Sequence, residues 1–158
     1  MSEHPMMKPV ECNCFAIRSA ARHISQFYDQ CLAPVGLRTT QFSILSRLKR
    51  VGPQTINALA EAMVMDRTTL GRNILPLERD GLIRIETAPS DRRAKELHLT
   101  KAGEKRLQAA FTGWQQAQAQ FEARYGRDRA AQLRSMLRAV VAGEPRPADQ
   151  GEAEVTEQ

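Results

Sequence analysis

The stretch DRTTLGRNILPLERDGLIRIETAPSDRRAKELHLT, residues 66–100, combines a helical pattern with a β-hairpin pattern. Asp66 is a good N-cap for the helix, and Gly81 is suited to end it as the residue after the C-cap. The pattern therefore predicts a short amphipathic helix over residues 66–79. Its buried face would consist of Leu70, Ile74 and Leu77.

The opposite face of this helix is polar and has a composition suited to a DNA groove. Arginine pairs with guanine edges, asparagine with adenine, and threonine with phosphate or a thymine methyl group. Pro76 lies inside the pattern, where it removes a backbone hydrogen bond, so we expect a kink or an early end of the regular helix. The side chains expected to contact DNA from this helix are Thr68, Thr69, Arg72 and Asn73.

Two short β-prone runs follow, at residues 82–87 and 96–100, and predict a hairpin with a charged loop at residues 88–95. Such a loop can contact phosphates or a minor groove. Asp91 is expected to hold an arginine in place rather than to contact DNA. A solvated turn is the alternative, because charge runs are usually solvated. The expected DNA contacts from the loop are Arg92, Arg93 and Lys95.

The order of these features resembles the MarR (multiple antibiotic resistance regulator) family of winged helix-turn-helix proteins. The resemblance rests on ERDGLI at residues 78–83, DRRAK at residues 91–95 and LTKAG at residues 99–103, and extends from about Cys14 to about Ala142. It implies a mainly α fold with a small β-hairpin wing, and a helical dimerisation region formed by the N- and C-terminal helices. It also implies a transcriptional regulator, most often a repressor, that a small molecule releases from double-stranded DNA.

Helical spacing and breaks in the rest of the chain predict its organisation. The helix-turn-helix would pair residues 55–63 with residues 66–79. The expected parts are a flexible leader at residues 1–10, an N-terminal dimerisation helix at 11–36, a winged helix-turn-helix DNA-binding domain at 37–100, C-terminal dimerisation helices at 101–142, and a disordered acidic tail at 143–158.

A long helix is expected from Thr100 to about Tyr125, with an apolar and aromatic stripe. So small a domain cannot cover this stripe alone, which favours a homodimer, and packing within one chain is the alternative. A homodimer would bind a pseudo-palindromic operator with half-sites about 34 Å apart. The stripe consists of Leu107, Phe111, Trp114, Phe121 and Tyr125.

Composition fits a nucleic-acid partner. The 158 residues have a formal net charge of +5, and residues 143–158 have a net charge of −4, so residues 1–142 have +9. No stretch is long and apolar enough to span a membrane, and no basic-then-apolar leader is seen, so we expect a cytoplasmic protein without a membrane partner.

Two kinds of signal could release the DNA. In the first, an anionic ligand is held by arginine and histidine, and its apolar part lies against aromatic rings. Family resemblance suggests an aromatic acid or its coenzyme A thioester, whereas the alternative is an arginine face paired with acids on the surface. The candidate ligand-binding residues are Arg18, Arg22, His23, Phe27, Phe42 and Trp114.

In the second kind of signal, a cysteine thiol senses an organic peroxide. Cys14-Phe-Ala-Ile resembles the reactive-cysteine stretch of the peroxide-sensing members, and the helix dipole favours a thiolate near a helix start. Cys12 could act as a resolving thiol. Arg18 occupies the position where those sensors have a tyrosine, and the alternative is a cysteine that serves as a small buried hydrophobe.

Other function classes receive little support. The chain has three cysteines and three histidines, without the spacing of a zinc site, and the odd cysteine count argues against a disulfide framework. No phosphate-binding glycine loop or nucleophile elbow is present, so we expect no metal, no cofactor and no enzyme activity. A helical interaction module would explain the aromatic stripe but not the basic wing.

Overall fold

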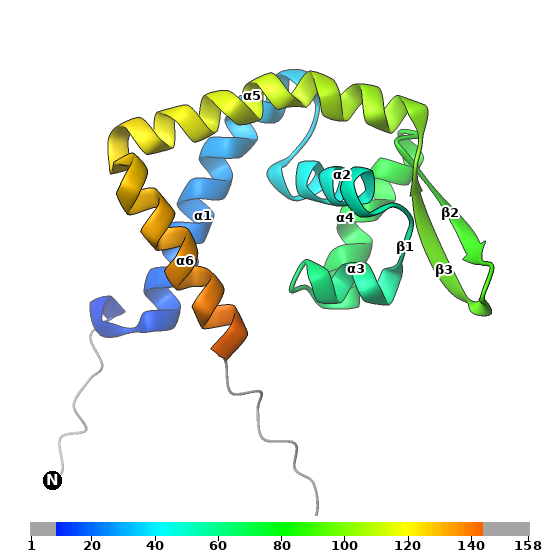
Figure 1. The fold of residues 1–158 in the computed structure, drawn as a ribbon, viewed down its shortest axis with the longest axis horizontal. Coiled ribbons are helices and arrows are strands. Elements are labelled where there is room, and N and C mark those ends of the chain that lie inside the picture. Colours follow the sequence, from blue (N-terminus) through cyan, green and yellow to red (C-terminus); the bar gives the residue numbers. More distant parts are fainter. Residues whose placement is uncertain (1–8, 144–158) are drawn as a thin grey trace, which may run out of the picture. The chain divides into compact units, whose positions relative to one another are not determined.

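The computed structural model describes residues 9–143 and consists mainly of helices with a small antiparallel sheet (Figure 1). The chain divides into two compact units, Met1–Ala117 and Gln118–Gln158. The expected leader and tail fall almost entirely on residues 1–8 and 144–158, outside the described residues. The elements are η1 (Pro9–Glu11), α1 (Asn13–Leu32), η2 (Ala33–Val35), α2 (Thr39–Val51), β1 (Gln54–Thr55), α3 (Ile56–Ala62), α4 (Arg67–Arg79), β2 (Ile83–Ala88), β3 (Asp91–Leu99), α5 (Lys101–Tyr125) and α6 (Arg127–Gly143).

The predicted helix-turn-helix is confirmed as α3 and α4. Thr55 caps α3, because its hydroxyl oxygen accepts from the Ala58 N–H at 3.1 Å. Asp66 caps α4 in the same way and accepts from the Thr69 N–H at 2.8 Å. Helix α4 runs through Pro76 to Arg79, so the regular helix does not end early.

One hydrophobic core holds the helix-turn-helix, the strands and the start of α5 together. The predicted buried face of α4 forms part of it. Burial of these side chains offsets the hydrogen bond that Pro76 removes. The core consists of Leu32, Leu37, Phe42, Ile44, Leu45, Leu48, Leu59, Ala60, Leu70, Ile74, Leu77, Leu82, Ile83, Leu97 and Ala110.

The wing is a two-stranded hairpin extended by β1 into a sheet of order β1-β3-β2 (Figure 1). The expected charged loop at residues 88–95 is wrong, since only residues 89 and 90 separate the strands. Ala88 pairs with Asp91, whereas Thr87 pairs with Lys95, so residues 92–94 form a bulge in β3. Strand β1 was not predicted, because two residues that follow a proline show no β pattern.

Helix α5 packs closely against the chain that precedes α2. A Cβ atom at Gly113 would collide with the backbone carbonyl of Cys31, so only glycine permits this approach. Arg106 donates from Nη1 to the Val35 carbonyl at 3.1 Å. Leu107 and Trp114 pack against the core of their own chain, so the expected stripe on α5 is not devoted to a dimer interface at these two positions.

The second unit consists of the end of α5 and α6. The rings of Phe121 and Tyr125 stack with centroids 5.4 Å apart, and the Arg129 guanidinium lies 4.5 Å from the centre of the Tyr125 ring. Arg127 and Arg134 both pair with Glu122. Among residues 9–143, no helix combines the length and the apolar character that crossing a bilayer requires. Helix α6 exposes the apolar side chains of Met136, Leu137, Val140 and Val141.

Candidate DNA interface and effector pocket

Helix α4 presents most of its predicted DNA-contacting side chains to solvent. Thr68, Thr69 and Arg72 are exposed, and Asn73 is half-buried. The Thr69 hydroxyl donates to the Asp66 carboxylate at 2.7 Å, and the Asn73 amide donates to the Thr69 carbonyl at 2.9 Å. The first turn of α4 is therefore held in place by its own side chains before any DNA arrives.

Asp66 is the residue whose ionisation is most clearly linked to this first turn. The Thr69 hydroxyl, followed by the Thr69 backbone N–H, lowers the pKa of the Asp66 carboxyl from its ordinary value of 3.8, because both groups donate to the charged form. Asp66 is consequently a carboxylate at neutral pH, at the positive end of the helix dipole.

The wing residues predicted to contact DNA are exposed as well. Arg92 and Arg93 lie in the bulge of β3, and Lys95 follows it and donates to the Thr87 hydroxyl at 3.1 Å. Asp91 accepts from the Arg93 backbone N–H at 2.9 Å, so it holds this segment through the backbone rather than through a guanidinium group. Whether Asp91 contacts DNA is not tested by this bond, so its structural role stays a prediction.

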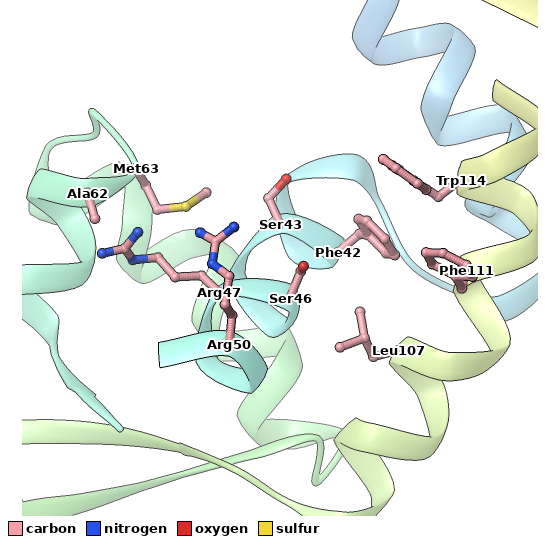
Figure 2. A pocket seen from close by; sticks show the side chains of 10 residues that line it. All are labelled: Phe42, Ser43, Ser46, Arg47, Arg50, Ala62, Met63, Leu107, Phe111 and Trp114. Atoms are coloured by element: carbon pink, nitrogen blue, oxygen red, sulfur yellow. The ribbon is translucent and has the colours of Figure 1, made fainter. Parts of the chain in front are cut away.

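A pocket of about 440 Å³ lies between α2, the C-terminal end of α3 and α5 (Figure 2). This volume is within the range of roughly 300–1,000 Å³ that small-molecule sites occupy. The pocket adjoins the helix-turn-helix directly, because Ala62 and Met63 at the end of α3 form part of its wall. The lining residues are Phe42, Ser43, Ser46, Arg47, Arg50, Ala62, Met63, Leu107, Phe111 and Trp114.

One side of the pocket is aromatic and the other is basic. Trp114 stacks with Phe42 at a centroid distance of 6.0 Å and with Phe111 at 5.5 Å. The guanidinium groups of Arg47 and Arg50 lie on the side toward Met63 (Figure 2). Such a pocket suits a planar apolar group with an anionic end, since rings stack on aromatic side chains and guanidinium groups bind carboxylates.

The structure brings together only part of the ligand site expected from the sequence. Phe42 and Trp114 line the pocket. The other four candidates lie on α1 and do not line the pocket. One of them, Phe27, is half-buried, and its ring meets the Tyr28 ring edge-on with centroids 5.8 Å apart. The side chains of the other three are exposed. Those three exposed candidates are Arg18, Arg22 and His23.

The basic side of the pocket was missed, although the sequence contains a signal for it. Four polar positions of α2 recur at intervals of three, one and three residues, which places them on one helical face. This face lies away from the buried stripe of the same helix. The four residues are Ser43, Ser46, Arg47 and Arg50, and all of them line the pocket.

The two cysteines near the N-terminus lie at the start of α1. Cys12 is its N-cap, and the Cys12 sulfur accepts from the Phe15 N–H at 3.4 Å. Cys14 is exposed in the first turn. Within residues 9–143, no three His, Cys, Asp or Glu side chains are grouped so that they could hold a metal ion.

A capped helix-turn-helix, an exposed polar face on its second helix and a hairpin wing with basic side chains define a winged helix-turn-helix DNA-binding protein. The model of the MarR family matches residues 37–95, which span α2 to the bulge of β3. The chain belongs to the MarR family of DNA-binding transcriptional regulators.

Individual relatives support this assignment. The chain is similar to the Mycobacterium tuberculosis transcriptional regulator MosR, solved in complex with DNA, with 36% identity, a TM-score of 0.70, and coverage of 85% of this chain and 100% of that one. It is also similar to the transcriptional repressor CouR, solved bound to a 23-mer DNA duplex, with 28% identity and a TM-score of 0.75. The match covers 89% of this chain and 99% of CouR. An uncharacterised helix-turn-helix regulator of Bacillus subtilis, YwoH, is 32% identical over 92 residues, which are 58% of this chain and 66% of YwoH.

Proposed function

We propose that this chain is a homodimeric repressor that binds a pseudo-palindromic operator and is released from it by a small aromatic anion. The observation that supports ligand control most strongly is the position of the pocket. Its walls come from α2 and α5 and from the end of α3, the first helix of the helix-turn-helix. An occupant therefore contacts the DNA-binding unit itself.

DNA binding is assigned to α4 and to the wing. We assign contacts with base edges to Arg72 and Asn73, and contacts with phosphates or the minor groove to Arg92, Arg93 and Lys95, of which all but the half-buried Asn73 are exposed. MosR and CouR, the relatives described above, were both solved with DNA. CouR is described as a repressor, which favours repression here.

Dimerisation is assigned to the terminal helices. Helix α1 exposes Phe15 and Ile17, and α6 exposes the four apolar side chains named above. Exposed apolar patches of this kind are typical of protein–protein interfaces. A second copy of the chain would cover them and would place two recognition helices about 34 Å apart.

The pocket favours an aromatic carboxylate as the effector. The aromatic side accepts the ring, and Arg47 and Arg50 bind the carboxylate. With a volume of about 440 Å³, the pocket accommodates an aromatic acid. The nucleotide part of a coenzyme A thioester would have to lie outside.

Trp114 provides the test, because it is the single tryptophan of the chain and forms part of the pocket wall. We expect benzoate, salicylate or 2-naphthoate to change its fluorescence at concentrations at which the corresponding neutral amides do not. Arg50→Gln should weaken this binding, whereas Arg18→Gln on α1 should not. The opposite ranking of the two variants would move the effector site to α1.

A second candidate, thiol-based peroxide sensing, is favoured by the exposure of Cys14. An organic hydroperoxide would oxidise the Cys14 thiolate to a sulfenic acid and leave as the alcohol, and Cys12 could then condense with it to a disulfide with loss of water. The expected result is operator release by cumene hydroperoxide, reversal by dithiothreitol, and no release in Cys14→Ser. Release that persists in Cys14→Ser would refute this candidate.

A further inference from the structure

Arg47 lines the pocket, and its side chain is also hydrogen-bonded to Gln54, which does not line the pocket. Its Nε–H donates to the Gln54 side-chain oxygen at 2.7 Å, and both residues are half-buried. A charge-assisted hydrogen bond of this length is among the stronger ones in proteins. Gln54 therefore restricts the orientation of the Arg47 guanidinium group.

This bond leaves most of the guanidinium group available for a ligand. A guanidinium group has five N–H donors in a fixed planar fork. Gln54 accepts from Nε, so the donors on the two terminal nitrogens remain for a carboxylate. Arg50 lines the same pocket but is exposed, whereas Arg47 is half-buried and hydrogen-bonded to Gln54.

Gln54 lies at a junction of the DNA-binding elements. It belongs to β1 and pairs with Leu97 of β3, whose side chain is fully buried. The next residue, Thr55, pairs with Glu96 and caps α3. Gln54 thus connects the pocket with the DNA-binding elements, through its side chain to Arg47 and through its backbone to β3 and to the start of α3.

We propose that Gln54 is a positioning residue that orients Arg47 in the effector pocket and couples effector binding to the wing and to α3. This inference rests on the proposed function of the pocket. An anionic effector attracts the Arg47 guanidinium group, and either β1 moves with it or the bond to Gln54 breaks. Both responses change the support of the wing and of α3, and thereby lower the affinity for the operator.

We define the coupling factor as the ratio by which saturating effector weakens the affinity for the operator. The effector used as a probe is 2-naphthoate. Trp114 fluorescence reports its binding, and the anisotropy of labelled DNA from upstream of the gene reports operator affinity. In wild type, we expect a factor in the range of about 5–150 that is typical of allosteric coupling. In Gln54→Met, which keeps the length of the side chain but lacks the amide oxygen, the factor should fall to within about twofold of one.

Gln54→Glu is the matched rescue variant. It keeps the acceptor and should retain the wild-type coupling factor, while 2-naphthoate binds more weakly because the added carboxylate competes for Arg47. A role of Gln54 in folding alone would leave the coupling factor unaltered in Gln54→Met, whatever the change in operator affinity without the probe. Arg47→Lys is a second, independent variant, because it keeps the positive charge without Nε–H. It should bind 2-naphthoate and fail to release the operator.

Loss of the Gln54 role and loss of the effector pocket would give different results. If Gln54→Met or Arg47→Lys releases the operator by the wild-type factor, the coupling role is overturned while the effector pocket stands. If 2-naphthoate leaves Trp114 fluorescence and operator affinity of the wild type unchanged, the proposed function of the pocket is overturned, and the role of Gln54 with it.

Discussion

Val64 is the residue of the helix-turn-helix with the least favourable backbone. Helices α3 and α4 end in the same way, with paired hydrogen bonds from Val64 and Met65 in the first case and from Gly81 and Leu82 in the second. The residue after the C-cap is left-handed in both, with φ of 53° at Val64 and 70° at Gly81. Glycine adopts this conformation freely, whereas a β-branched residue does not.

Val64→Gly should therefore stabilise the protein, by about 1 kcal/mol in the free energy of unfolding, since the left-handed region costs an L-residue about 1–2 kcal/mol. Urea denaturation measures the effect. The matched control is Val51→Gly, at an exposed valine that ends α2 without a positive φ. We expect this control to be neutral or destabilising, and equal stabilisation by both changes would show that backbone strain at Val64 is not the cause.

Asp66 gives a pH-dependent prediction. Because its pKa is lowered in the folded protein, its contribution to stability is fully present above the ordinary value of 3.8 and is lost as the pH falls through the folded-state pKa. Asp66→Asn keeps a capping oxygen without this titration. The melting temperature of wild type should exceed that of Asp66→Asn at pH 6, and the difference should shrink below pH 4. A difference that does not depend on pH would contradict the assignment.

At the scale of elements, the recognition helix and the wing should contribute differently to DNA binding. Arg72→Ala should cost about 1–3 kcal/mol at the operator and relax base preference if Arg72 contacts a base. Arg93→Ala should weaken binding to operator and unrelated DNA alike, and should reduce the salt dependence.

Titrations of both variants with operator and scrambled duplexes at several salt concentrations separate these roles. Lys105→Ala, which removes an exposed charge from α5, is the control for net charge. Unchanged operator affinity in Arg72→Ala would contradict base contact by this residue. A loss in Arg93→Ala that is confined to the operator would contradict phosphate contact.

The elements that a local signal defines were predictable from sequence. Asp66, Gly81 and the buried stripe between them delimited α4 to within one residue, because capping and periodicity act within a few residues. The bulge of β3 and the strand β1 depend on pairing with distant residues, and neither has a sequence pattern of its own. Composition alone could not distinguish a charged loop from a bulged strand.

The pocket, too, could be predicted only in part from the sequence. Phe42 and Trp114 were predicted as ligand residues, but three of their four expected partners on α1 are exposed, and the cations of the pocket come from α2. Polar residues at helical spacing are usually a solvated face. The packing of α5 and the end of α3 around α2 turns this face into a pocket wall, and this packing is a tertiary property.

At the scale of the whole molecule, DNA affinity should depend on dimerisation. Val140→Glu introduces a charge into the exposed apolar face of α6 and should convert the proposed dimer into a monomer. The salt dependence of DNA binding should then fall to about half, because one subunit makes half of the phosphate contacts.

Sedimentation velocity and salt titration of operator binding measure both effects. Ala131→Glu is the matched control, since Ala131 is also exposed on α6 but lies on the side opposite Val140 by helical spacing. A dimer that persists in Val140→Glu with full operator affinity would place the interface elsewhere.

The most direct test of ligand-controlled DNA binding is the affinity of this chain for DNA upstream of its own gene, measured across salt concentrations with and without saturating 2-naphthoate. We expect steeply salt-dependent binding that is tighter than binding to unrelated DNA. Saturating 2-naphthoate should abolish this binding, and its neutral amide should leave it intact. Equal affinity for the two DNAs would contradict ligand-controlled operator binding, as would operator binding that no aromatic anion changes while Trp114 reports an occupied pocket.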